Sequence, residues 1–96
     1  MSKEIASLAK ALSDENRVLI LELLIKGETC GCTLIDKLPI SQPTMSYHLR
    51  LLTDSGLITS LKEGVWKKHH VNMDKIDELI EYLTQLKKVT TVCRND

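Results

Sequence analysis

Apolar side chains recur every three or four positions through the first half of the chain, which is the periodicity of amphipathic helices. The breaks in this pattern predict a first helix over residues 1–12, a second between Ser13 and Gly27, a third between Thr29 and Pro39, and a fourth over 41–55. Ser13, Thr29 and Ser41 carry the hydroxyl groups that cap helix N-termini. The second helix is apolar on most sides, so we expect it at the centre of the fold.

The pattern changes after residue 56. Residues 57–62 and 65–72 are predicted strands, and Glu63 and Gly64 between them are predicted to form the tight turn of a hairpin. Helical spacing then returns over residues 73–90, while residues 91–96 have no such pattern and are expected to form a flexible tail. The predicted order is ααααββα, which is a mainly α fold with a small β-hairpin (α+β) in a single domain over residues 1–96.

This order of elements is typical of the winged helix-turn-helix fold. A short helix, a brief break and a second helix occupy residues 29–55, and the hairpin over 57–72 follows as the wing. The apolar stripes of the first and last helices exceed what one core of this size can cover. We therefore expect a homodimer in which the helices over 1–12 and 73–90 meet their partner. The residues expected between the subunits are Ile5, Leu8, Ile76, Ile80 and Leu83.

Charge is distributed unevenly along a chain whose formal net charge is zero. Residues 41–71 hold four basic side chains against two acidic ones, and the helix that follows is acidic. A local basic surface in a neutral protein favours DNA contact by one face only. The chain has no apolar run of membrane-spanning length and no signal-peptide core, and its three cysteines are an odd number. We expect a cytoplasmic protein with free thiols.

Three segments of the chain resemble the ArsR/SmtB family of metalloregulatory repressors. They read ALSDENR over residues 11–17, ETCGCTL over 28–34 and ISQPTMSYHLRLL over 40–52, and the resemblance extends over residues 5–85. The Cys-x-Cys in the second segment is similar to the arsenic- and antimony-sensing branch. The resemblance implies a dimeric repressor, not an enzyme, whose first and last helices form the subunit interface.

The fourth predicted helix would then enter the major groove of operator DNA, which we expect to be an imperfect inverted repeat. Its polar residues suit base edges and phosphates, and two wing lysines suit the phosphate backbone. The candidate DNA-binding residues are Ser41, Gln42, Thr44, Ser46, Tyr47, His48, Arg50, Lys62 and Lys67. Two alternatives remain: Ser41 acts only as a helix cap, and Lys67 is ordinary solvated surface. Trp66 is expected to pack under the wing, and His69, which shares a strand face with Val71, to be partly buried.

Cys30 and Cys32 are the candidate metal ligands. At the start of a helix both thiols are expected to have lowered pKa values, and soft thiolates select soft ions. The resemblance implies As(III) or Sb(III) as inducer, with no organic cofactor. Positions i and i+2 lie about 200° apart on an ideal helix, so one ion could hold both only if the first turn unwound, which Gly31 would ease.

The third metal ligand is left open by the sequence. The family's arsenic motif often has another cysteine three residues after the second, and Ile35 stands there. Cys93, from the same or the partner chain, is one candidate, and solvent or an exogenous thiol is the other. A zinc site on the last helix is disfavoured because residues 73–90 contain no histidine.

Other functions compete with metalloid sensing. The same fold could respond to Cd(II), Pb(II) or Zn(II), or to oxidation through a disulfide among the cysteines. A winged helix could also serve protein interaction without DNA, although the polar face from Gln42 to His48 argues against this. An enzyme is disfavoured, because the chain has no phosphate-binding loop or paired-acid motif.

Overall fold

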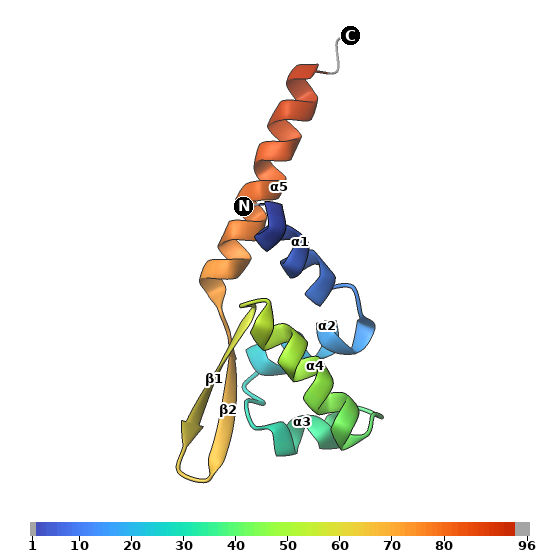
Figure 1. The fold of residues 1–96 in the computed structure, drawn as a ribbon, viewed down its shortest axis with the longest axis vertical. Coiled ribbons are helices and arrows are strands. Elements are labelled where there is room, and N and C mark those ends of the chain that lie inside the picture. The colour runs from blue at the N-terminus through green and yellow to red at the C-terminus, as the bar shows by residue number, and fades with distance from the viewer. Residues whose placement is uncertain (1, 94–96) are drawn as a thin grey trace.

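The computed structural model describes residues 2–93, without the side chains of Trp66 and of residues 89–93. The described residues form α1 (Ser2–Ala11), α2 (Glu15–Ile25), α3 (Gly31–Lys37), α4 (Gln42–Asp54), β1 (Ile58–Glu63), β2 (Trp66–Val71) and α5 (Met73–Cys93) (Figure 1). The predicted order ααααββα is confirmed. The last helix extends to Cys93, past the end predicted at residue 90. None of the helices in this part of the chain is long and apolar enough to cross a membrane.

The start of α2 is set by Asp14 rather than by Ser13. Asp14 has an extended backbone, and its carboxylate accepts hydrogen bonds from the N–H groups of Asn16 (2.8 Å) and Arg17 (3.2 Å). The Ser13 hydroxyl instead donates to the carbonyl oxygen of Lys10 at the end of α1. The prediction of Ser13 as the cap is therefore wrong by one residue, because a carboxylate stands next to the hydroxyl and takes the capping position.

The two helices of the helix-turn-helix begin differently. Ser41 caps α4 as predicted, since its hydroxyl accepts a hydrogen bond from the N–H of Thr44 at 3.3 Å. The first residue of α3 is Gly31, and Cys30 occupies the N-cap position with no hydrogen bond from its side chain to the helix. The prediction that Thr29 caps this helix is wrong, because Thr29 lies one residue too early.

The hairpin is an antiparallel pair whose turn lies one residue later than predicted. Glu63 pairs with Trp66, so the two turn residues are Gly64 and Val65. Gly64 has a φ of +62°, in the left-handed region that a two-residue hairpin turn requires. Only glycine adopts this conformation without a steric cost, so the position of Gly64 determines the position of the turn.

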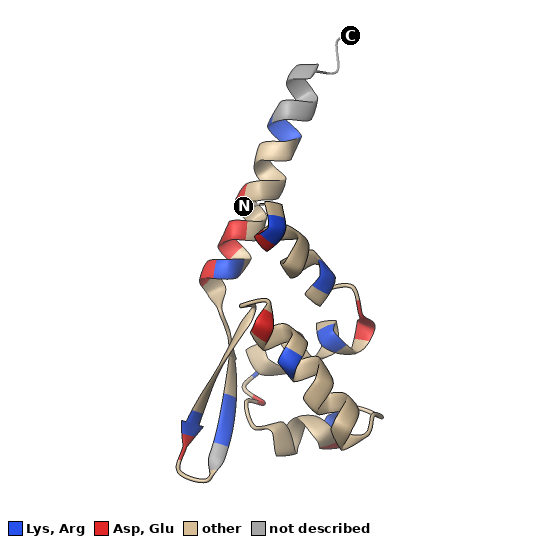
Figure 2. Ribbon diagram, in the orientation of Figure 1, with Lys and Arg blue, Asp and Glu red and all other residues tan. Residues whose placement is uncertain are grey.

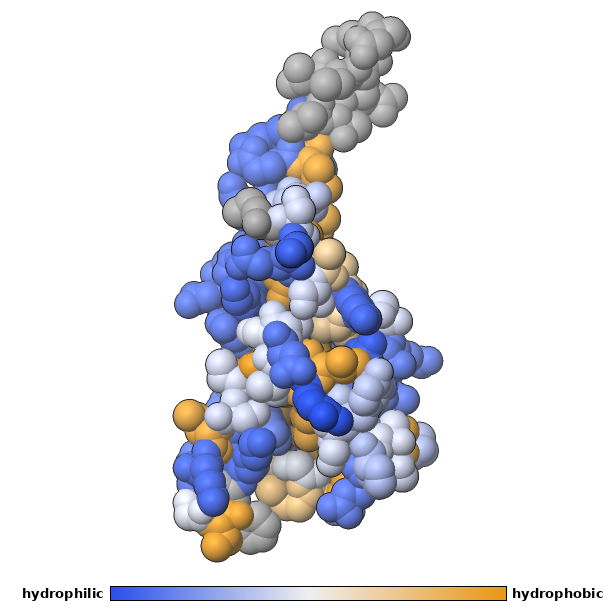
Figure 3. Space-filling model, viewed as in Figure 1, coloured by the Kyte–Doolittle hydropathy of each residue, from blue (hydrophilic) through white to orange (hydrophobic). Residues whose placement is uncertain are grey.

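The core lies around α2, between α1, α4 and the hairpin. Its fully buried side chains include Leu8, Ile20, Leu34, Leu52, Leu57 and Ile58. Ile5 also belongs to this core, so the chain itself already covers two of the residues that we expected a partner subunit to cover. Ile80 and Leu83 on α5 are 56% and 52% exposed. Beyond α1, α5 rises from the body of the molecule (Figure 1), and apolar surface runs along it (Figure 3).

Candidate DNA interface and cysteine site

One face of α4 carries polar side chains into solvent. Met45 and Leu52 turn inward, which leaves the polar residues at the start of the helix on the outside. The exposed candidates are Ser41, Gln42, Thr44, Ser46, Tyr47 and Arg50. The Ser41 hydroxyl donates to Oγ1 of Thr44 at 2.9 Å in addition to capping the helix. These side chains form a continuous polar surface on the first turns of α4, the part of a recognition helix that reaches base edges.

His48 is not part of this surface. It is 5% exposed, and its Nδ1 lies 3.0 Å from Nη1 of Arg17, a buried residue of α2. Arginine only donates, so Nδ1 accepts, and the ring proton is assigned to Nε2, which lies 3.8 Å from the carboxylate of Asp14. The prediction that His48 contacts DNA is wrong, because its ring is enclosed between α2 and α4. Its spacing from Met45 and Leu52 was the signal in the sequence that it faces inward.

Arg17 makes further bonds that hold α1, α2 and α4 together. Its Nε donates to the carbonyl oxygen of Ala11 at 2.9 Å, and its Nη2 donates to that of Lys10 at 3.3 Å. Both carbonyls belong to the last turn of α1, where helix carbonyls have no partner within the helix. One buried guanidinium thus joins the end of α1 to the middle of the recognition helix through His48.

The hairpin carries basic side chains on both strands (Figure 2). Lys62 and Lys67 are exposed and directly paired across the strands, so their charges lie on one face. Lys68 instead lies 3.8 Å from the carboxylate of Glu63. Like charges placed opposite one another repel, and a phosphate backbone would relieve that repulsion. The Trp66 side chain, expected under the wing, lies outside the described residues.

Cys30 and Cys32 lie close together at the start of α3. Cys30 has an extended backbone and precedes the helix, two positions before Cys32, and each thiol affects the pKa of the other. The hydrogen bond from Cys32 and the N–H of Cys32 lower the pKa of the Cys30 thiol, and the nearby Lys68 acts in the same direction. The same thiol–thiol hydrogen bond raises the pKa of Cys32. The prediction that both pKa values are lowered is therefore wrong for Cys32.

The helical angle behind the expected unwinding of α3 does not describe this pair of cysteines. The angle of about 200° between positions i and i+2 applies only when both residues are helical. Cys30 has φ −89° and ψ 135°, outside the helical region, so that angle does not apply to the pair.

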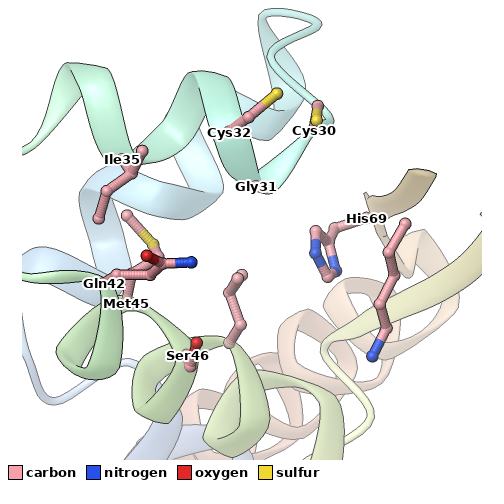
Figure 4. A pocket seen from close by; sticks show the side chains of 10 residues that line it. Cys30, Gly31, Cys32, Ile35, Gln42, Met45, Ser46 and His69 are labelled. Carbon is pink, nitrogen blue, oxygen red and sulfur yellow. The ribbon is translucent and has the colours of Figure 1, made fainter. Parts of the chain in front are cut away.

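A cavity of about 360 Å³ separates the cysteine pair from α4 and β2. Cys30, Gly31 and Cys32 line one side, Gln42 and Ser46 of α4 a second, and His69 of β2 a third (Figure 4). Gln42 and Ser46 are also on the polar surface of α4. The cavity therefore lies directly beneath the start of the candidate recognition helix.

His69 was expected to be partly buried, and it is 5% exposed. Its Nδ1 lies 2.7 Å from the Ser60 hydroxyl, and burial, with Lys67 and His70 nearby, lowers its pKa. Sequence reasoning did not identify it as a site residue. The strand alternation showed that it points inward, but only the fold shows that it points at the cysteine pair.

The N-terminus of α3 is joined to the wing through the backbone. The N–H of His69 donates to the carbonyl oxygen of Thr29 at 2.9 Å, and Cys30 forms an isolated bridge with Lys68. A displacement of residues 29–30 therefore acts on β2 directly. Within the described part of the chain, no three His, Cys, Asp or Glu side chains already converge on one metal position. The side chain of Cys93, the third candidate ligand, lies outside the described residues.

Comparisons with known proteins agree with this geometry. The family model described as bacterial regulatory protein, arsR family, matches residues 14–60. The chain is 37% identical to the arsenical resistance operon repressor of Staphylococcus aureus over 95 residues, which are 97% of this chain and 91% of that protein. The chain belongs to the ArsR family. Its similarity extends well beyond the helix-turn-helix to nearly the whole chain.

Solved structures of the ArsR family share the complete fold. An ArsR-like transcriptional regulator from Rhodococcus sp. RHA1 has a TM-score of 0.81 at 26% identity, over 96% of this chain and 89% of that one. A homodimeric winged helix-turn-helix DNA-binding domain from Mycobacterium bovis has a TM-score of 0.72 at 24% identity, over 94% of this chain and 82% of that one. The predicted winged helix-turn-helix is confirmed, and the chain is a transcriptional regulator rather than an enzyme.

Proposed function

We propose that this ArsR-family protein is a dimeric repressor that leaves its operator when As(III) or Sb(III) binds Cys30 and Cys32. The observation that carries the proposal is the position of the two adjacent thiols. They border the cavity beneath α4, and the preceding residue is hydrogen-bonded to the wing. The resistance repressor of S. aureus, similar over nearly the whole chain, supports a metalloid as the signal.

DNA binding is assigned to two surfaces, one at the start of α4 and one on the hairpin. Ser41, Gln42, Thr44, Ser46 and Tyr47 would face the major groove, with Arg50 on a phosphate. Lys62 and Lys67 would hold the backbone beside it, because their paired charges are otherwise left in mutual repulsion. An operator with two half-sites, arranged as an imperfect inverted repeat, would fit a dimer with two such surfaces.

The dimer interface is assigned to α5. Ile80, Leu83 and Leu86 recur at helical spacing along it and are all at least 44% exposed. Such a stripe is stable in water only when another apolar surface covers it. The neighbour of the same fold from M. bovis is a homodimer, which supports a second copy of this chain as the cover.

Release of DNA follows from the connection between the thiols and the two DNA-binding surfaces. A soft ion binds thiolates, so both thiols lose their protons and turn their sulfur atoms to the ion. Any shift of residues 29–32 that accompanies this change acts on β2 through Thr29 and on α4 through the shared cavity. An inducer can release DNA only if it binds the displaced arrangement more tightly than the DNA-bound one.

The test is operator release measured with the full-length protein against As(III), Sb(III), Cd(II), Pb(II), Zn(II) and peroxide. Cys30→Ser and Cys32→Ser should each keep operator affinity and lose release by As(III) and Sb(III), while Ser13→Ala should behave as the unmutated protein. Release by peroxide alone would show that the signal is oxidation of the cysteines and not a metalloid. Normal induction of the double cysteine variant would reject the sensing site, and no operator binding at all would leave only a role in protein interaction.

A further inference from the structure

We propose that His69 is a third ligand of the cysteine site, and that the site thereby accepts a divalent d¹⁰ cation of the Zn²⁺ and Cd²⁺ class through two sulfurs and one nitrogen. The inference rests on the proposed role of Cys30 and Cys32 as ligands. It adds a donor from the wing that no cysteine motif contains.

The position of the His69 ring carries the inference. His69 lines the same 360 Å³ cavity as Cys30 and Cys32 (Figure 4). A methyl group built on Gly31, the residue between the two cysteines, would meet Nε2 of His69 at 4.0 Å, which is ordinary van der Waals contact. The imidazole nitrogen thus faces the peptide that joins the two thiol-bearing residues.

The two nitrogens of His69 are arranged as in a metal-binding histidine. Nδ1 is 2.7 Å from the hydroxyl of Ser60, which fixes the orientation of the ring. Among the described residues no hydrogen bond reaches Nε2, which leaves its lone pair free to face the cavity once the Nδ1 proton is donated to Ser60. A ligand histidine usually has its second nitrogen held by such an outer partner.

The donor set selects the class of ion. Two thiolates and one imidazole, with water in the fourth position, are a known tetrahedral environment for zinc, with Zn–S bonds of about 2.3 Å and Zn–N bonds of about 2.0–2.1 Å. Two such Zn–S bonds hold their sulfur atoms about 3.8 Å apart, a separation that two cysteines two positions apart in the chain can adopt. Binding releases the two thiol protons and none from the neutral imidazole.

The site needs a movement to form, and that movement is toward the wing. Among the described residues, no three His, Cys, Asp or Glu side chains converge on one metal position. Each cysteine has a single side-chain torsion, so the thiols can rotate into the cavity, while His69 is held by Ser60 and by the backbone bond to Thr29. A cation that draws the thiols and the imidazole together therefore pulls α3 and β2 toward one another.

The test uses the reduced full-length protein titrated with Cd²⁺, followed by thiolate-to-cadmium absorbance and by competition with a chelator. His69→Ala should weaken Cd²⁺ and Zn²⁺ binding at least about tenfold. It should leave the affinity for As(III) within about twofold, because that ion keeps its two thiolates. His70→Ala is the matched control: His70 is the exposed neighbour on the other face of β2, and its removal should change neither affinity.

Two further measurements separate ligation from a structural role of the buried ring. Cd²⁺ should shift the ¹⁵N resonance of His69 Nε2 and leave that of His48 unchanged. His69→Cys should restore Cd²⁺ affinity and raise the thiolate absorbance by about half, since three sulfurs replace two. Unchanged Cd²⁺ affinity in His69→Ala, or an unshifted Nε2 resonance, would overturn the inference, as would a loss of Cd²⁺ affinity in Cys93→Ser alone.

Failure of the inference is distinguishable from failure of the proposed function. If Cys30→Ser abolishes metalloid release while His69→Ala binds Cd²⁺ normally, the sensing site stands and the third ligand is overturned. If the double cysteine variant is still released by As(III), the proposed function fails. The ¹⁵N measurement then decides separately whether His69 binds a cation.

Discussion

The N–H of His69 donates a 2.9 Å hydrogen bond to the carbonyl oxygen of Thr29, and this bond joins the wing to the residue that precedes the cysteine pair. Thr29 is thereby held beside the second strand of the hairpin, and Cys30 bridges Lys68 next to it. The wing and the start of α3 therefore move together. Under the proposed function, a ligand at the cysteines would act on β2 through these contacts and on α4 across the cavity that they share.

The first prediction concerns Gly31→Ala. An alanine methyl meets only an ordinary contact with His69, and an alanine in the first turn of α3 favours the helix. Because Cys30 precedes the helix with an extended backbone, we expect metalloid binding without unwinding, and the affinity for As(III) should stay within about twofold of the unmutated protein. As(III) titration followed by thiol absorbance measures it. A loss of tenfold or more would show that the first turn must open after all.

The two thiols should differ in reactivity as a function of pH. The hydrogen bonds that stabilise the Cys30 thiolate lower its pKa, so its alkylation by iodoacetamide should reach half its maximal rate at a lower pH than an ordinary cysteine. Cys32, with a raised pKa, should reach that point at a higher pH. Mass spectrometry of the alkylated peptides, with single-cysteine variants as standards, separates the two. Cys32→Ala should move the Cys30 profile back toward higher pH, because the donated hydrogen bond is gone.

Substitution of Arg17 should lower the stability of the fold, whereas substitution of Arg50 should weaken DNA binding. Arg17→Ala leaves His48 Nδ1 and the carbonyl oxygen of Ala11 without their donor and removes one of the donors to Lys10, and we expect a loss of about 2–4 kcal/mol in the free energy of unfolding. Arg50→Ala removes an exposed side chain and should change stability by less than about 0.5 kcal/mol, while it weakens operator binding. Urea unfolding and a gel shift on both variants check this. Equal stability of the two would contradict the role of Arg17.

Local features of this fold could be predicted from the sequence, and features that depend on distant contacts could not. Ser41 was identified as a cap because its partner lies three residues away. His48 was placed on the DNA-binding surface because polar residues surround it, whereas its partner Arg17 lies 31 positions earlier in the chain. Cys30 was treated as helical, although one extended residue is enough to bring the thiols together. The position of His69 beside the cysteines depends on how β2 packs against α3, and the periodicity of the sequence does not show this packing.

Gln42 and Lys62 should affect DNA binding in different ways. Gln42 is exposed at the first position of α4 and can pair with a base edge, so Gln42→Ala should cost about 1–3 kcal/mol on the operator and relax sequence preference. Lys62→Ala should weaken binding to operator and random DNA alike. It should also reduce the slope of log K against log salt concentration by about one, because one phosphate contact is lost. Fluorescence anisotropy over a salt series on both DNAs distinguishes them. An equal loss on operator and random DNA for Gln42→Ala would remove Gln42 from base recognition.

The last prediction concerns the exposed stripe of α5. Leu83 is 52% exposed in the single chain and lies between Ile80 and Leu86, which are also exposed. If a second copy covers it, Leu83→Asp would bury an unpaired charge, so the dimer should dissociate and operator binding should fall with it. Sedimentation equilibrium and a gel shift on the same preparation measure both. Ile25→Asp is the matched control, because Ile25 is 64% exposed at the end of α2 and lies away from that stripe, so this variant should remain a dimer. An unmutated protein that is monomeric at micromolar concentration would contradict the assignment, as would a Leu83→Asp variant that still sediments as a dimer.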